Sequence, residues 1–169
     1  KILNYSTPQA IDILKKGLAD FAIVTEPFDL PAGLYANALR GIQEVPVCST
    51  AFSLTTGTSL TDEQLKQFPL IGLGENTSSF SFYSEFFSRM GMSYMPDVEA
   101  ATADQILPMI KSELGIGFVP TDFLEKEDLE GLIILKMEPP IPPRSVCMLK
   151  RHGAPLSVAA AALERMIRQ

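Results

Sequence analysis

A short stretch near the start of the sequence constrains the fold of this chain more than any other feature. Thr7 is a suitable N-cap, Pro8 suits the first turn of a helix because it lacks an N–H, and Gly17 can adopt the left-handed conformation that ends a helix. The unbroken apolar run at residues 21–24 predicts a strand that is covered on both faces. With a further strand expected at residues 2–5, this stretch predicts a strand–helix–strand unit.

The same kind of pattern recurs along the chain. Capping boxes at residues 61–64 and 102–105 each precede an apolar segment with helical spacing. Buried strands are expected at residues 70–73 and, after a glycine stop, within residues 114–120, and an amphipathic helix is expected at residues 155–168. This alternation of strands and helices predicts an α/β fold in which helices cover both faces of parallel sheets.

Composition and charge argue against a membrane protein, a nucleic-acid-binding surface and a disulfide-rich or metal-binding protein. The 169 residues are 46% hydrophobic, which is enough for one domain or two small lobes. No apolar run approaches the roughly 20 residues of a membrane span. The net charge of −6 argues against nucleic-acid binding by this surface. Two cysteines cannot form a disulfide framework and no Cys/His spacing suggests a metal site, so we expect a reducing, cytoplasmic location.

The sequence contains no constellation of catalytic residues. The single histidine, His152, lies in a polar turn, and we expect neither cysteine to have a histidine or a helix N-terminus beside it that would lower its pKa. The serines at positions 78–81 lack the G-x-S-x-G pattern, and residues 72–74 are too short for a dinucleotide fingerprint. We therefore expect neither an enzyme, nor a metal, nor a cofactor.

Three segments, taken in order, carry a more specific signal. Residues 14–23 contain G-x-x-D-x-A-I after a helix, residues 65–71 read L-x-x-x-P-L-I, and residues 106–120 place G-x-G before a proline. Together they resemble the effector-binding domain of LysR-type transcriptional regulators, a bacterial family. Two residues of the third segment depart from the family pattern, namely Pro108, which should kink the helix, and Glu113, which stands where a small residue is more usual.

The resemblance implies two Rossmann-like lobes joined by two crossover strands, a fold similar to type 2 periplasmic binding proteins. On this basis the expected boundaries are residues 1–47 plus 150–169 for lobe one, 53–143 for lobe two, and 45–51 and 145–149 for the crossovers. The family domain also begins with a further strand and helix, preceded by a winged helix-turn-helix. We therefore expect this chain to be an incomplete domain.

The expected function is the sensing of a small molecule. Capped helix starts at Thr7, Ser78/Ser79 and Thr102 would lie at the carboxyl ends of strands, where free N–H groups can hold an anion such as a carboxylate. The expected effector-binding residues are Thr7, Thr25, Ser78, Ser79, Phe80 and Thr102. The alternative for each hydroxyl is that it only caps its own helix. Alternative functions are a periplasmic solute-binding protein and an enzyme on the same fold.

The resemblance also implies a homodimer or tetramer that contacts DNA only through the helix-turn-helix, and no membrane partner. The aromatic helix at residues 80–90 has more apolar width than one core face requires, so Tyr83, Phe87 and the nearby Met95 are expected at the dimer interface. Cys48 and Cys147 fall near the middle of the two expected crossovers. Opposed side chains on antiparallel neighbours lie about 5 Å apart, so we expect two reduced, buried cysteines close together in the hinge.

Overall fold

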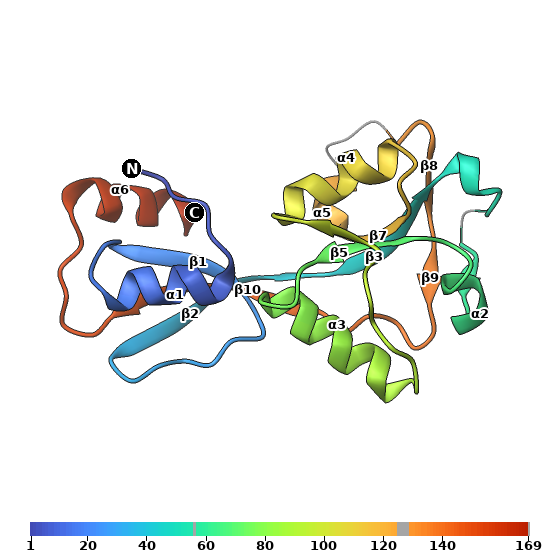
Figure 1. Cartoon of the computed structure of the whole chain (residues 1–169). Helices are drawn as coiled ribbons and strands as arrows, with labels where there is room; N and C mark the ends of the chain where they lie inside the picture. The colour runs from blue at the N-terminus through green and yellow to red at the C-terminus, as the bar shows by residue number, and fades with distance from the viewer. Residues whose placement is uncertain (56, 125–128, 169) are drawn as a thin grey trace. The chain divides into compact units, whose positions relative to one another are not determined.

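The computed structural model describes residues 1–55, 57–124 and 129–168, and the chain divides into two compact units (Figure 1). Unit 1 consists of Lys1–Gly41 and Arg144–Gln169, and unit 2 consists of Ile42–Pro143. The chain therefore enters unit 2 after Gly41 and leaves it after Pro143. The expected crossover at residues 45–51 lies wholly in unit 2 and the one at residues 145–149 lies wholly in unit 1, so neither connects the two units.

Unit 1 is built on a three-stranded sheet with the order β1-β10-β2, in which β1 and β10 are antiparallel. Its elements are α1 (Thr7–Lys15), β1 (Phe21–Thr25), β2 (Leu34–Ile42), β10 (Arg144–Arg151) and α6 (Val158–Ile167). The expected helix–glycine–strand unit is present, because Gly17 ends α1 with a φ of +74°. One detail differs, since Ser6 is the N-cap and its N–H donates to Oε1 of Gln9 at 3.1 Å, which makes Thr7 the first helical residue.

Two expectations for unit 1 are wrong. Residues 2–5 form no strand, and Ile2 is 90% exposed. The apolar side chains of this segment are not buried, so no burial offsets the entropy lost in ordering a strand. In addition, β1 is covered on one face only, because Ala22 and Val24 are buried against α1 while Ile23 is 46% exposed.

Hydrogen bonds of the Asp20 and Arg151 side chains hold the helices of unit 1 in place. The carboxylate of Asp20 accepts from the N–H of Ser157 at 2.9 Å and from its hydroxyl at 3.2 Å, and Ser157 is the N-cap of α6. The guanidinium Nη1 of Arg151 donates to the carbonyls of Leu14, at 2.6 Å, and Ala19, at 2.8 Å, at the end of α1. The aspartate of the G-x-x-D segment therefore has a structural role, which is to fix the start of the last helix.

Replacing Asp20 with alanine should lower the free energy of unfolding by about 1–2 kcal/mol, because two hydrogen bonds to a carboxylate are lost at a partly solvated site. Urea unfolding gives the change, and hydrogen exchange should show faster opening of α6 than of α1. Asp29→Ala is the matched control, since Asp29 is an exposed loop aspartate and should change stability by less than about 0.5 kcal/mol. Equal effects of the two substitutions would contradict this role for Asp20.

Unit 2 is built on a five-stranded sheet with the order β6-β5-β7-β3-β8 and a small parallel pair, β4-β9. The strands are β3 (Glu44–Ser49), β4 (Ser59–Leu60), β5 (Leu70–Leu73), β6 (Val98–Ala100), β7 (Ile116–Pro120), β8 (Leu132–Ile134) and β9 (Lys136–Met137). The helices are η1 (Thr50–Phe52), α2 (Asp62–Leu65), α3 (Ser78–Arg89), η2 (Ala103–Gln105), α4 (Ile106–Lys111) and α5 (Thr121–Leu124).

The fold is α/β as expected, but its sheets are mixed and not parallel throughout. β5 is parallel to β6 and β7, whereas β3 is antiparallel to β7 and β8. The parallel strands are those joined by helices along the chain, which is the connection that parallel pairs require. β3 instead follows β2 directly from unit 1, and no helix sets its direction.

Helices cover both faces of the unit 2 sheet, with α3 on one side and α4 on the other (Figure 1). An aromatic cluster that includes Phe87 and Phe118 lies on the α3 side, and an aliphatic cluster that includes Ile71 and Ile110 lies on the α4 side. The expected kink at Pro108 is wrong, because α4 begins at Ile106 and the proline therefore falls in its first turn, where no helical N–H is needed. Within the described residues, no helix is long and apolar enough to cross a membrane.

Candidate functional site

The structure gathers the expected effector residues of unit 2 at the carboxyl edge of its sheet, which is the side on which strands β5 and β6 end. β5 and β6 are parallel neighbours, with Leu73 opposite Ala100, so the segments that follow them start from the same edge. α3 follows β5 and begins at Ser78, and η2 follows β6 with Thr102 as its N-cap. Open α/β sheets bind ligands at the carboxyl ends of such strands.

The start of α3 differs from the expectation in one respect, because its N-cap is Thr77. The hydroxyl Oγ1 of Thr77 accepts from the N–H of Phe80 at 3.2 Å and donates to the carbonyl of Gly74 at 2.8 Å. Ser78 and Ser79 are thus the first two helical residues, and both are half-buried. Neither hydroxyl is needed to cap the helix, and the first turn has N–H groups without a carbonyl partner inside the helix.

The other two residues expected at this edge have structural contacts of their own. The ring of Phe80 packs edge-on against Tyr94, with 5.5 Å between ring centroids, so it belongs to the border of the aromatic cluster. Thr102 is part of the expected capping box, in which Oε1 of Gln105 accepts from the N–H of Thr102 at 3.4 Å and from that of Ala101 at 2.9 Å. These contacts fix the positions of Phe80 and Thr102 at the sheet edge.

Unit 1 brings together the other two expected residues. Thr7 is the first residue of α1 and Thr25 is the last residue of β1. Because a short turn joins the end of α1 to the start of β1, both threonines lie at the end of the pair opposite that turn. Sequence reasoning missed the residues that fix the chain after Thr25. The carboxylate of Glu26 accepts from the N–H of Ser145 at 3.0 Å, and the guanidinium of the buried Arg144 donates to the Glu26 carbonyl at 3.1 Å.

Sequence reasoning also missed two residues of unit 2. Thr77 was one of three consecutive hydroxyl residues, and local sequence does not decide which of them caps the helix. Glu99 is an exposed carboxylate on β6 at the edge where α3 begins. A single acidic residue in a short strand has no sequence signature.

The expected dimer interface is wrong for two of its three residues. Tyr83 is 4% exposed and Phe87 is 1% exposed, because both side chains lie inside unit 2. Tyr83 stacks on Phe118 with ring centroids 4.7 Å apart, and Phe87 packs edge-on against the same ring at 5.8 Å. The aromatic width of α3 therefore serves the core of its own unit. Met95 is 76% exposed and remains available for a partner.

The expected pairing of the two cysteines on neighbouring strands is also wrong. Cys48 lies on β3 in unit 2 opposite Ile133, and Cys147 lies on β10 in unit 1 opposite Val24. They belong to different sheets because the chain passes between the units at residues 41–42 and 143–144, before each expected crossover begins. Both thiols are buried, and this burial raises the pKa of each, with the charge of Glu26 as a smaller cause for Cys147.

Both thiols should react slowly in the native protein. The thiolate is the reactive form, so a raised pKa lowers the reactive fraction at any given pH, and burial blocks access. We expect reaction with Ellman's reagent at about pH 8 to be about 100-fold slower than that of free cysteine. Unfolding in guanidinium should release both thiols, which serves as the control. Rapid reaction of either thiol in the folded chain would contradict this arrangement.

Within residues 1–55, 57–124 and 129–168, the side chains of His, Cys, Asp and Glu form no group of three or more that could hold a metal ion. The groups available around the expected effector residues of each unit are therefore hydroxyls, backbone N–H groups and single charged side chains.

Comparisons with known proteins identify the fold. The family model of the LysR substrate binding domain matches residues 2–169. Similar solved structures include the bromide ion-bound regulatory domain of HypT from Salmonella typhimurium, with a TM-score of 0.74 at 20% identity, covering 97% of this chain and 78% of that chain. The regulatory domain of CcmR from Synechocystis PCC6803 in complex with 2-PG has a TM-score of 0.75 at 17% identity, covering 99% and 80%.

Two further similar structures belong to longer chains, of which this chain covers different shares. The reduced form of OxyR from N. meningitidis has a TM-score of 0.72 at 21% identity, and the match covers 97% of this chain and 76% of that chain. The Corynebacterium glutamicum OxyR C206 mutant has a TM-score of 0.72 at 16% identity, but this chain spans only 51% of its length. At such identities the similarity establishes the fold.

Proposed function

Because this chain belongs to the LysR substrate binding domain family, we propose that it is the effector-sensing part of a LysR-type transcriptional regulator and binds a small anionic metabolite. The observation that carries this proposal is the convergence of two helix starts, with Ser78, Ser79 and Thr102, at the carboxyl edge of β5 and β6. The family consists of regulatory ligand-binding domains, so we do not propose catalysis.

The chemistry of this edge suits an anion. The first turn of α3 directs N–H groups outward and carries the positive end of the helix dipole, and the serine hydroxyls supply further donors. The HypT regulatory domain is bromide-bound and the CcmR regulatory domain is in complex with 2-PG, and these neighbours are consistent with small ligands on this fold. We also propose Thr7 and Thr25 of unit 1 as effector-binding residues.

Three further proposals concern the full regulator, namely its DNA binding, its self-association and its location. We propose that DNA binding belongs to a separate helix-turn-helix domain, because a surface with net charge −6 repels phosphates. We further propose a cytoplasmic homodimer or tetramer, with the exposed Met95 near one contact. Thiol oxidation is not proposed as the signal, because both cysteines are buried.

A binding screen with matched variants tests the proposal. Thermal shift followed by calorimetry against small carboxylates, phosphates and 2-PG should find a compound that stabilises the chain. Ser78→Ala and Thr102→Val should each weaken its binding about tenfold, since each removes one hydrogen bond to a charged group. Ser88→Ala, an exposed serine near the other end of α3, should leave binding unchanged. Failure of every compound, or equal binding by all variants, would refute the proposed site.

A further inference from the structure

Glu99 stands at the same sheet edge as the start of α3. It is the middle residue of β6 and lies opposite Gly72 of β5. Its neighbours Val98 and Ala100 face the aliphatic cluster on the α4 side. Because successive side chains of a strand point to opposite faces, the side chain of Glu99 lies on the face that α3 covers.

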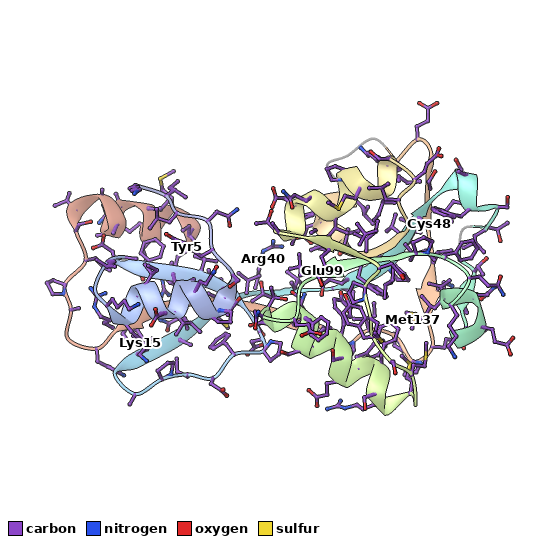
Figure 2. All side chains as sticks on the ribbon, viewed as in Figure 1. Tyr5, Lys15, Arg40, Cys48, Glu99 and Met137 are labelled. Atoms are coloured by element: carbon purple, nitrogen blue, oxygen red, sulfur yellow. The ribbon has the colours of Figure 1, made fainter. Side chains whose placement is uncertain are left out.

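The carboxylate lies against the turn that leads into α3 (Figure 2). An ideal Cβ built on Gly74 would be 2.9 Å from Oε2 of Glu99, so the absence of a side chain at position 74 lets the carboxylate approach the backbone there. Gly74 opens the turn that the Thr77 hydroxyl closes. The acidic group is therefore adjacent to the helix start at which we propose that the effector is bound.

This carboxylate is exposed, and among the residues that the structure describes it has neither a hydrogen-bond partner nor an ion-pair partner. A negative charge at this position repels a simple anion at the start of α3, and it attracts a positive group held at a short distance from that anion. The two neighbouring features thus favour a ligand that carries both signs of charge.

We propose that Glu99 sets the specificity of the effector site by binding an ammonium group, so that the effector is an amino acid or a related amino-carboxylate. This inference rests on the proposed function, and it adds the class of metabolite. The carboxylate of the ligand contacts the first turn of α3, and its ammonium group donates to the carboxylate of Glu99. The competing role for Glu99 is electrostatic stabilisation of the α3 N-terminus alone, which would leave ligand preference unaffected.

Calorimetric titrations with matched pairs of ligands test the inference. Each proteinogenic L-amino acid is compared with its des-amino acid, for example L-alanine with propionate, L-aspartate with succinate and L-glutamate with glutarate. The native chain should bind at least one amino-carboxylate about tenfold or more tightly than its des-amino partner. Glu99→Gln should remove that preference, because the amide cannot pair with ammonium as a charge. Glu75→Gln, which removes an exposed charge from the same turn, should retain it.

The outcomes separate this inference from the proposed function. Equal binding of amino and des-amino ligands, or a preference that survives Glu99→Gln, overturns the role of Glu99. If such ligands still bind and Ser78→Ala weakens them, the proposed function stands. A lower melting temperature of Glu99→Gln with unchanged ligand preference assigns Glu99 to helix stability and also overturns the inference. If no compound of either kind binds, both fail.

Discussion

Phe87→Asp should prevent unit 2 from folding. The Phe87 ring is 1% exposed and lies between the rings of Phe86, Tyr94 and Phe118, with centroid distances of 5.7, 5.3 and 5.8 Å. The substitution removes the burial of a large aromatic side chain and places a carboxylate in an apolar cluster, at a combined cost of more than about 5 kcal/mol. Such a loss is comparable with the whole stability of many domains.

Circular dichroism and urea unfolding measure this effect. Phe87→Leu keeps the site apolar and should lower the free energy of unfolding by only about 1–2 kcal/mol, which keeps the chain measurable. Met95→Asp is the control on an exposed residue and should change it by less than about 0.5 kcal/mol. If the Phe87→Asp chain folded and its self-association changed, Phe87 would lie at an interface between subunits and not in the core of unit 2.

Gly115→Ala should be the second most damaging single substitution that we consider. An ideal Cβ at Gly115 would lie 2.2 Å from the carbonyl oxygen of Pro69, and the φ of Gly115 is +156°. The same Pro69 oxygen accepts from the N–H of Ile116 at 2.8 Å, so it cannot move without loss of that hydrogen bond. Separation of β5 from β7 at this point should cost about 3–5 kcal/mol.

Gly41→Ala is the matched control, because nothing lies within 4 Å of a Cβ built there. It should change the free energy of unfolding by less than about 0.5 kcal/mol. Urea unfolding of the two variants side by side gives the comparison. If Gly115→Ala were tolerated as well as Gly41→Ala, the close contact between the β5 and β7 segments would be incorrect.

Features fixed by local chemistry could be predicted from the sequence. The helix that ends at Gly17, the strand after it and the capping box at Thr102 all depend on residues within a few positions of one another. Where several neighbours could cap a helix, the prediction missed by one residue, as for Ser6 and Thr77. Hydroxyl side chains have nearly equal capping ability, so sequence alone does not separate them.

Features that depend on distant residues could not be predicted in the same way. The apolar width of α3 was evident, but Tyr83 and Phe87 are covered by Phe118 and Tyr94, which come from segments later in the chain. The direction of β3 and the placement of the two cysteines on different sheets depend on where the chain changes units. Glu99 was not a candidate from sequence, because it lies on β6 whereas Gly74, against which its carboxylate lies, belongs to the turn after β5.

The most direct test of the central claim is a map of amide chemical shifts on the isotope-labelled chain, titrated with the tightest-binding compound of the screen. An effector at the carboxyl edge of β5 and β6 should shift the amides of residues 77–80 and 101–103 most, because their N–H groups lie next to the ligand. The amides of α6 should move little. Shifts concentrated on α6, with residues 77–80 and 101–103 unchanged, would contradict the account.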